Sequence, residues 1–292
     1  MIRGWVFAAV VGSLALTTAL PARAADMPLK APPAPLPPSW TGFYVGAQIG
    51  GGWNDHTVNY TPNDPLAALI VNGTAGFPGQ QPFAAHGLNL SGVTGGVEAG
   101  YNWQVNSAWL VGLEADFSGS GIHGSGSGTS VLLVAPPNIV TQTVASEQKV
   151  DWWGTVRARL GWLARPDLLL YGTGGFAYGR VAVSDSLTFN GPPGVVIGNL
   201  PPFSFVCAIN VICFSGATSD VKYGWTAGAG GEWRVARNWS FKAEYLYVNL
   251  GKASTNVVAN TLFIPGSTPA SYRANFGDTD FHVVRVGVNY HF

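Results

Sequence analysis

Eight segments in which apolar and polar residues alternate constrain the fold most, because this pattern is typical of half-buried β-strands. Each segment is at least as long as the roughly 9–11 residues that a tilted strand needs to cross a bilayer. The segments are residues 42–53, 90–103, 108–119, 149–163, 168–183, 220–235, 239–251 and 280–292. The pattern predicts an all-β fold built from long strands.

Short and long connections alternate strictly between these segments. The tight turns are residues 104–107, 164–167 and 236–238. The long connections are residues 54–89, 120–148, 184–219 and 252–279. Outer-membrane barrels have this layout, with short periplasmic turns and long extracellular loops. We therefore predict an eight-stranded antiparallel up-and-down transmembrane β-barrel with long extracellular loops, both ends of which lie on the periplasmic side.

The composition agrees with a surface that is only partly in water. Charged residues make up 10% of the chain, whereas soluble globular proteins have about 25%. The 39 glycines and 11 tryptophans suit closely packed strands and membrane interfaces. No block of like charges is present, which argues against a nucleic-acid partner.

The first 24 residues have the features of a secretory signal peptide. Arg3 precedes an apolar run, and the small-residue pattern Ala22-Arg23-Ala24 follows Pro21, as a signal peptidase requires. The alternative is a membrane-anchor helix, which Pro21 and the small-residue pattern disfavour. Cleavage after Ala24 would leave 13 basic and 15 acidic side chains.

A proline-rich stretch separates the signal peptide from the first strand. Its sequence, DMPLKAPPAPLPPS, predicts an extended, semi-rigid spacer in the periplasm. The predicted organisation is therefore a signal peptide at 1–24, a periplasmic spacer at 25–40 and an outer-membrane barrel at 41–292. After the signal peptide no run of about 18 apolar residues follows that would predict a membrane-spanning helix.

The two cysteines, Cys207 and Cys213, lie six positions apart in CAINVIC. In an exported chain such a close pair favours a disulfide that closes a short loop. A metal site is the weaker interpretation, because the sequence has no further cysteine and no histidine near the pair.

The charged residues of the strands fall on the parity opposite to the apolar residues. In a soluble sandwich the charged face would be in water, whereas in a membrane barrel apolar residues face lipid and polar residues face the lumen. We therefore assign these charged side chains to the lumen: Glu98, Glu114, Asp116, Asp151, Arg157, Arg159, Lys222, Glu232, Lys242, Glu244 and Arg285. Both signs are present in similar numbers, which fits either an interlocked salt-bridge core or a narrow ion-conducting path. Inward glycines such as Gly100 and Gly230 leave room for bulky neighbours or for water.

Aromatic residues gather at the short-turn ends of the strands, as in an interfacial girdle. They are Trp103, Trp109, Trp162, Tyr171, Trp233, Trp239, Tyr290 and Phe292. The chain stops inside its last alternating segment, FHVVRVGVNYHF, which predicts that this strand closes the barrel against the first one.

Several of these segments resemble a known family. They are LLLYGTGGFAYG, GWTAGAGGEWRVARNWSFKAEYLYVNLG, the closing strand that ends in Phe292, and WTGFYVGAQIGGGW after the proline-rich spacer. They are similar to the small outer-membrane β-barrel proteins of alphaproteobacteria, labelled porin-family or outer-membrane immunogenic proteins and related to opacity-type eight-stranded barrels. The resemblance covers roughly residues 40–292.

The resemblance implies a surface-exposed barrel in the bacterial outer membrane, with roles in envelope integrity and host contact. It implies assembly by the barrel-assembly machinery, which recognises a C-terminal aromatic strand, here with Tyr290 and Phe292 as the signal. Some members of the family are described as porin-like and some as haem-binding. The family carries no catalytic motif.

Three groups of residues suggest other chemistries. GTGGFA, at 172–177, fits a dinucleotide fingerprint, but the alternating residues after it are not the required helix. His282, close to Asp280 and Thr279, suggests a lipid-modifying enzyme, but no serine nucleophile can be placed beside it. The histidines of the long connections, His56, His86 and His123, suggest haem or metal binding without showing a ligand motif.

The sequence therefore predicts a barrel with a structural envelope role and a surface-interaction role, without catalysis and without a cofactor. A narrow porin-like channel and a haem- or ligand-binding surface protein are the alternatives. The expected partners are outer-membrane lipid and lipopolysaccharide, the barrel-assembly machinery, and other barrels or a host surface. The apolar connections ANTLFIPGSTPASY and FNGPPGVVIGNLPPF fit packing over the barrel mouth or adhesion.

Overall fold

Eight antiparallel strands form a closed barrel in a computed structural model that describes residues 39–74, 76, 79–135, 138–199, 203–262 and 265–292. The predicted signal peptide and most of the spacer lie outside the described residues. The barrel strands are β1 (Gly42–Pro62), β2 (His86–Gln104), β3 (Trp109–Ala135), β4 (Asn138–Arg165), β5 (Leu168–Asn190), β8 (Ile212–Arg234), β9 (Trp239–Ala259) and β11 (Ser271–His291).

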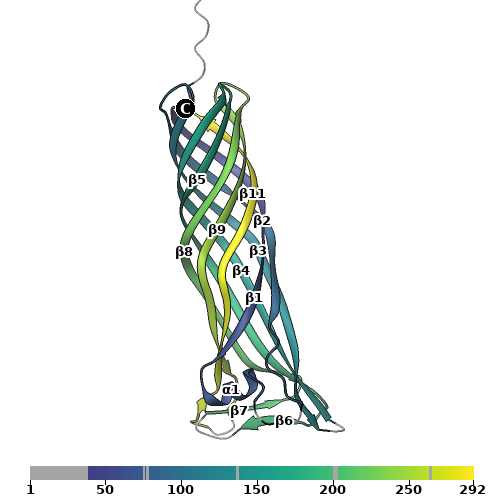
Figure 1. The fold of residues 1–292 in the computed structure, drawn as a ribbon. Coiled ribbons are helices and arrows are strands. Elements are labelled where there is room, and N and C mark those ends of the chain that lie inside the picture. Colours follow the sequence, from purple (N-terminus) through teal and green to yellow (C-terminus); the bar gives the residue numbers. More distant parts are fainter. Residues whose placement is uncertain (1–38, 75, 77–78, 136–137, 200–202, 263–264) are drawn as a thin grey trace, which may run out of the picture. The chain divides into compact units, whose positions relative to one another are not determined.

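The barrel closes where the sequence predicted, between the last strand and the first. Neighbours follow the order β1-β11-β9-β8-β5-β4-β3-β2, and Val45 of β1 pairs with both Tyr290 of β11 and Ala99 of β2. This closure leaves the barrel without a free strand edge, as a β-structure in lipid requires. Tight turns join the strands at the end marked C in Figure 1.

The opposite end carries the remaining elements (Figure 1). Helix α1 (Pro65–Val71) follows β1, and a small sheet has the order β10-β7-β6, with β6 (Val196–Asn199), β7 (Phe203–Ala208) and β10 (Thr268–Pro269). Asp64 caps α1, because its side chain accepts a hydrogen bond from the Ala67 amide, and Pro65 suits the first turn. No helix among the described residues is long and apolar enough to cross a membrane.

The strands continue far into the segments that the sequence analysis assigned to long loops, which corrects that part of the prediction. β1 ends only at Pro62, β3 runs to Ala135, and β4 begins at Asn138. The physical reason is that apolar and polar residues still alternate there, but the apolar residues now point inward and the polar residues outward. Along β4, Val140 and Val144 point inward and Thr143 and Ala145 outward, so no apolar outward row marks the strand.

The reversal divides the barrel into two parts, which we call the trunk and the crown. The trunk consists of residues 42–53, 93–119, 152–179, 223–249 and 281–292, and the crown of the described residues within 54–92, 120–151, 180–222 and 250–280. The outward face of the trunk is apolar, with Val97, Leu113 and Val286 more than half exposed. The outward face of the crown is made largely of serine, threonine, asparagine and charged residues.

The interior of the crown is a hydrophobic core. Val58, Leu88, Leu187 and Phe214 have an exposed fraction of 0%, and the apolar side of α1 belongs to the same cluster. Burial of such side chains contributes about 1.5–3 kcal/mol each relative to exposure. The crown is therefore built like the barrel of a water-soluble protein.

The glycine-rich segment GSGIHGSGSGTS, whose composition is typical of a flexible loop, lies in strand β3. Its inward glycines pack directly on the backbone before and within β2. A Cβ at Gly124 would lie 2.5 Å from the Asn89 carbonyl oxygen, and one at Gly126 would lie 2.4 Å from that of Gly87. These glycines are required for close approach, so their alternation reflects packing and not flexibility.

The short-turn end carries most of the predicted aromatic girdle. Trp103, Trp109, Trp162 and Trp233 point outward and are 45–50% exposed. Tyr171 was assigned wrongly to this girdle: it faces inward and is 4% exposed. It lies in β5, whose glycines obscure the alternation, so its parity could not be read from the sequence.

Trp40 closes the interior at the same end. The sequence analysis assigned Trp40 to the spacer, but the ring is 1% exposed and lies under the Arg234 guanidinium, with a distance of 4.2 Å to the ring centre. Its indole donates a hydrogen bond to the Pro166 carbonyl, and the Arg234 side chain donates one to the Ser39 carbonyl. The packed structure therefore begins before the first strand.

Candidate functional site: the charged interior of the trunk

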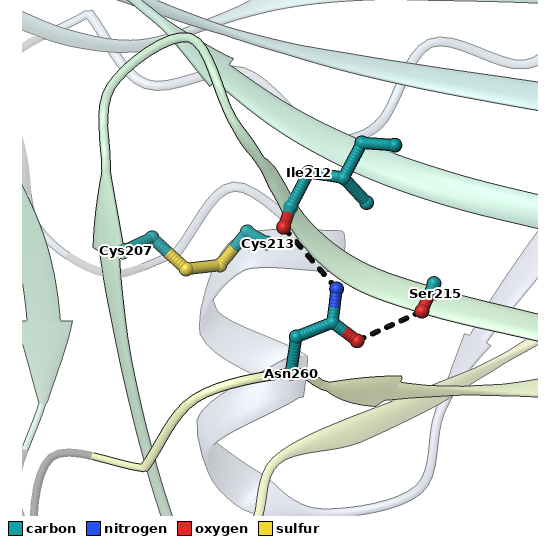
Figure 2. The surroundings of a disulfide bond; sticks show 5 residues. All are labelled: Cys207, Ile212, Cys213, Ser215 and Asn260. Atoms are coloured by element: carbon teal, nitrogen blue, oxygen red, sulfur yellow. Dashed lines mark hydrogen bonds between the residues drawn. A yellow bond between two sulfur atoms is a disulfide. The ribbon is translucent and has the colours of Figure 1, made fainter.

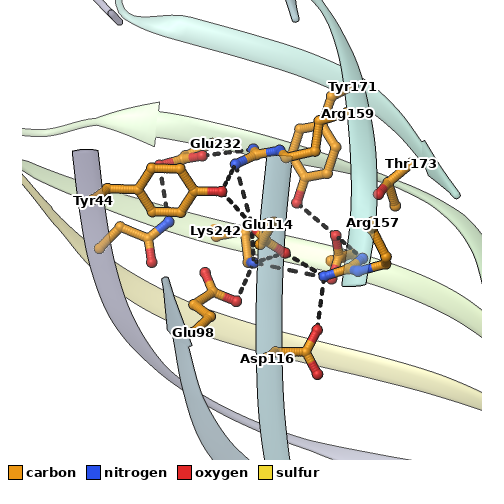
Figure 3. Close-up of polar contacts among 12 residues, drawn as sticks. Tyr44, Glu98, Glu114, Asp116, Arg157, Arg159, Tyr171, Thr173, Glu232 and Lys242 are labelled. Carbon is orange, nitrogen blue, oxygen red and sulfur yellow. Dashed lines mark hydrogen bonds and ion pairs between the residues drawn. The ribbon is translucent and has the colours of Figure 1, made fainter. Parts of the chain in front are cut away.

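Nine of the predicted lumen residues form one buried cluster in the trunk. Figure 3 shows the part of this cluster around Glu114. The exposed fractions of the nine residues are 0–5%. They are Glu98, Glu114, Asp116, Arg157, Arg159, Glu232, Lys242, Glu244 and Arg285. Period-2 alternation on each strand directs these side chains to the same side, and barrel closure brings them together.

Strand register places opposite charges beside each other. Glu114 pairs directly with Arg157 across β3 and β4, and Glu232 with Lys242 across β8 and β9. Glu244 likewise lies opposite Arg285 in the pairing of β9 with β11. Opposite charges at such directly facing positions stabilise a sheet, so part of the cluster is determined by register alone.

Glu114 is the centre of the cluster. Its carboxylate contacts Arg157, lies 3.2 Å from an Arg159 nitrogen and 3.3 Å from the Lys242 ammonium. The Tyr44 hydroxyl donates a further hydrogen bond to it at 2.6 Å. These donors offset the cost of removing the carboxylate from water.

A second set of contacts surrounds Glu244. Arg157 and Arg285 approach its two carboxylate oxygens at 2.9 and 2.6 Å, and the Tyr171 hydroxyl donates to it at 3.0 Å. Arg157 and Arg285 also share Asp116, at 3.1 and 3.2 Å. Each arginine therefore bridges two or more acids, and the pairs form one continuous network.

Glu232 extends the network toward the short turns. It accepts a hydrogen bond from Arg159 at 2.8 Å and from the Asn289 amide at 3.0 Å. The Ser240 hydroxyl and the His291 ring contact the same carboxylate. Sequence reasoning missed the histidine, although its position on the inward parity of the last strand could have indicated it.

Two tyrosines fill the space that inward glycines leave. A Cβ at Gly100 would lie 2.4 Å from the Tyr44 ring, and one at Gly230 would lie 2.6 Å from the Tyr171 hydroxyl. The Arg159 guanidinium lies over the Tyr171 ring at 4.0 Å, a cation–π geometry. Aromatic rings therefore occupy the room beside these two glycines, one of the two outcomes that the sequence left open.

Asp151 and Lys222 do not join the cluster, contrary to the prediction. A β-bulge between Val150 and Trp152 inserts Asp151 as an extra residue, so parity cannot be carried across it. Asp151 contacts Lys149 on the outer face at 2.9 Å. Lys222 lies in the crown, is partly exposed and contacts Asp220 at 3.7 Å.

The crown has a smaller buried polar cluster around Asp185. Its carboxylate accepts hydrogen bonds from Ser146 at 2.5 Å, from Tyr272 at 2.8 Å and from Tyr60 at 3.3 Å. Burial raises the pKa of Asp185 to about 6, although the three hydroxyl donors act against that rise. His86 lies near the Tyr60 hydroxyl, and burial lowers the pKa of this histidine.

A disulfide joins Cys207 to Cys213, with the two Cα atoms 5.5 Å apart. It connects β7 to the beginning of β8 (Figure 2). Beside it the Asn260 amide donates to the Ile212 carbonyl and accepts from the Ser215 hydroxyl. The covalent link ties β7 to β8, and the Asn260 hydrogen bonds tie the chain after β9 to β8.

The histidines considered for ligand binding do not converge. His56 contacts Asp280, His86 lies inside the crown near Tyr60, and His123 bonds the Gly121 carbonyl on the outer face of β3. His282 bonds the Tyr245 hydroxyl at 2.7 Å. Within the described residues no three His, Cys, Asp or Glu side chains are grouped to hold a metal ion.

Comparison with known proteins agrees with this architecture. The family model described as outer membrane protein beta-barrel domain matches residues 12–292. The chain belongs to this family. It is therefore an outer-membrane protein of the Gram-negative type, and the predicted resemblance is confirmed.

Two relatives show how far the similarity extends. The 31 kDa outer-membrane immunogenic protein of Brucella melitensis is 34% identical over 290 residues, which cover 97% of this chain and 98% of the relative. The 22 kDa outer membrane protein of Rhizobium leguminosarum bv. viciae is 28% identical, over 74% and 68% of the two chains. The crystal structure of OprG from Pseudomonas aeruginosa aligns with a TM-score of 0.37 and 11% identity, over 86% of this chain and 97% of that one.

Proposed function

We propose that this protein is a closed barrel with a structural role in the envelope, which presents its crown as a rigid surface outside the cell. One observation carries the proposal. The charged side chains of Arg157, Arg159 and Glu114 are 0% exposed, although a conducting path would have to pass them. An eight-stranded barrel has an interior that side chains can fill.

The crown supports the same proposal, because its hydrophobic core follows the charged cluster along the interior of the barrel. A water-filled path would have to cross both the ion pairs of the trunk and a layer that contains Leu187 and Phe214, each 0% exposed. The polar outer face of the crown suits water, so we place the crown outside the cell and the short turns in the periplasm.

Conductance in planar bilayers tests the closed lumen. The purified protein should show no channel steps under conditions in which a general porin, inserted as a positive control, conducts. Heat-modifiable migration on gels would show that the same sample is folded. Regular conductance steps from folded protein would contradict the proposal and favour the narrow channel.

The proposal includes the absence of catalysis, which His282 allows to be tested. Its ring stacks with Trp53 and bonds Tyr245, which suits an interfacial aromatic group. Mass spectra of lipid A from cells that express the wild type or His282→Ala should be identical. A lipid A modification present only with the wild type would contradict the non-enzymatic role.

Assembly of the barrel is proposed to depend on the aromatic end of β11. Phe292 is 74% exposed and its ring packs edge-on against Tyr290, so it contributes little to the folded core. Phe292→Ala should therefore reduce the amount of assembled barrel in cells while the assembled fraction keeps its thermal stability. Unchanged assembly would exclude Phe292 as part of the signal for the barrel-assembly machinery.

A further inference from the structure

The outer faces of β3, β4, β5 and β8 carry a continuous aromatic band where the trunk meets the crown. Phe117 packs against Trp152 with 5.5 Å between ring centres, and Trp152 against Tyr178 with 6.1 Å. Phe176 then connects Tyr178 to Tyr223, with 6.1 and 6.0 Å between centres. Such a band suits the boundary between acyl chains and headgroups.

A group of charged side chains lies directly above this band, on the crown side of the same strands. Lys149 and Arg180 approach the two Asp151 oxygens at 2.9 and 3.7 Å, and Arg180 also donates to Ser219 at 2.9 Å. The Lys149 and Arg180 side chains are each 52% exposed. Their carboxylate partner fixes them while leaving both accessible to an anion, and phosphate oxygens accept charge-assisted hydrogen bonds from arginine and lysine.

Above the charged group the same four strands form a shallow groove of about 920 Å³ on the outer face of the crown. Small side chains line it, so no bulky residue blocks a ligand. The serines are Ser125, Ser127, Ser184, Ser186 and Ser215, and Glu147 adds a carboxylate at the same surface. Hydroxyl and carboxylate groups at this density can exchange hydrogen bonds with a polyhydroxylated ligand.

The opposite side of the barrel differs at the same height. There β1 and β11 present Asp55, Asp278 and Asp280, and Asp280 is bonded by Asn54 and Tyr247. Lys252 is the cation of this region, and it lies opposite Asp278 in the pairing of β9 with β11. This side is net acidic, whereas on the face of β4, β5 and β8 the bases Lys149, Arg180 and Lys222 balance the acids Glu147, Asp151 and Asp220. An anionic ligand is therefore more strongly disfavoured on the side of β1 and β11.

We propose that the face formed by β3, β4, β5 and β8 binds one molecule of lipopolysaccharide. Its acyl chains would lie on the aromatic band, its lipid A phosphates on Lys149 and Arg180, and its core sugars in the serine-lined groove. The order of the three surfaces along the strands is the order of these chemical groups in the lipid. The inference deepens the proposed surface role and rests on the orientation proposed above, but not on a closed lumen.

Native mass spectrometry of the detergent-purified protein tests the phosphate contacts. The wild type should retain rough lipopolysaccharide and lipid A in preference to dephosphorylated lipid A and phosphatidylglycerol. The double substitution Lys149→Ala with Arg180→Ala should weaken binding of phosphorylated lipid A about tenfold, as expected when charge-assisted hydrogen bonds are lost. Asp151→Asn should strengthen it, because a competing negative charge is removed.

Lys252→Ala is the matched control, since it removes an exposed cation from the opposite side and should leave binding unchanged. Ala145→Trp would fill the groove and should weaken binding of rough lipopolysaccharide but not of lipid A. Equal retention of dephosphorylated lipid A, or an equal loss with Lys252→Ala, would overturn the proposal. The conductance measurement is independent, so failure of this inference and failure of the closed-lumen proposal can be told apart.

Discussion

The trunk and the crown are built from the same strands, but the trunk buries a network of charged side chains and the crown buries mainly apolar ones. Along β4 the trunk exposes Val156, at 51%, and buries Arg157, at 1%. The crown buries Val144 at 1% and turns Glu147 outward. Period-2 alternation is kept within each part, although the bulge at Asp151 interrupts it between them, and the medium outside the barrel changes. The comparison teaches that alternation predicts the strand, whereas the surroundings decide which face is apolar.

A bulge marks the change on β4, at Asp151 between the two parts. The trunk segment from Trp152 to Trp162 has aromatic residues at both ends, and its length matches the roughly 9–11 residues that cross a bilayer. The position of the bulge therefore coincides with the expected outer edge of the membrane.

Removal of a trunk arginine should have the largest effect. Arg157→Ala leaves Glu114, Asp116 and Glu244 short of a partner, and loss of one member of a buried ion pair costs about 3–5 kcal/mol. The temperature at which gel migration changes from the folded to the unfolded form should fall markedly. Arg165→Ala is the control, because its ion pair with Asp167 is exposed. Equal effects would show that burial does not determine the strength of the network.

A cavity in the crown core should act locally. Leu187 is 0% exposed, and Leu→Ala at such a site costs about 2–5 kcal/mol. Leu187→Ala should make the crown sensitive to protease, while the trunk remains as a protected fragment with folded migration. Thr188→Ala, on the outward side of the same strand, should change neither. Loss of both parts together would show that trunk and crown unfold as one unit.

The buried carboxyl of the crown predicts a pH dependence. The pKa of Asp185 is about 6 in the folded protein, above the ordinary value of about 3.9, so the fold favours the protonated form. The crown should be most stable below about pH 4 and lose up to about 3 kcal/mol as the pH rises to about 6.

Asp185→Asn should abolish this loss, as seen by hydrogen exchange in β5 after correction for the intrinsic exchange rate. The comparison of wild type with variant isolates the carboxyl, because the neighbouring His86, with its lowered pKa, contributes with the opposite sign. Tyr60 and Tyr272 have raised pKa values and stay protonated in this range. A variant with the same pH profile as the wild type would contradict the assignment.

The disulfide should have the smallest of these effects. It closes a short loop between Cys207 and Cys213, for which chain entropy gives about 2 kcal/mol. Replacement of both cysteines by serine should increase proteolysis within β7 and leave the trunk unchanged. Proteolysis of β7 at the wild-type rate would show that its pairing with β6 and the hydrogen bond from the Val206 amide to the Thr261 carbonyl are enough to hold it.

The trunk could be predicted from the sequence because lipid imposes a strong signal. Val93, Val97 and Trp103 share one parity of β2 and Glu98 the other, so strand, face and lumen side chain follow together. The failures have local causes. Asp151 lies at a bulge. Tyr171 lies in a strand whose glycines have no side chain to show which face points inward.

The crown could not be predicted in the same way. Its strands alternate inward valine with outward serine, as at Val183 and Ser184, and glycine at 124, 126 and 128 replaces apolar residues where backbones approach. Such segments look like polar loops when read alone. The partners within the network, such as Glu114 with Tyr44, depend on register and closure, which no single segment encodes.

Spin labels on the outer face of one strand test the central claim, that lipid surrounds the trunk and water surrounds the crown. Val156→Cys and Ala145→Cys each add one free thiol, since Cys207 and Cys213 are joined, and both positions point outward on β4. In liposomes a label at position 156 should collide with dissolved oxygen, and one at 145 with a water-soluble nickel chelate. Equal accessibility of the two labels to the nickel chelate would contradict the account.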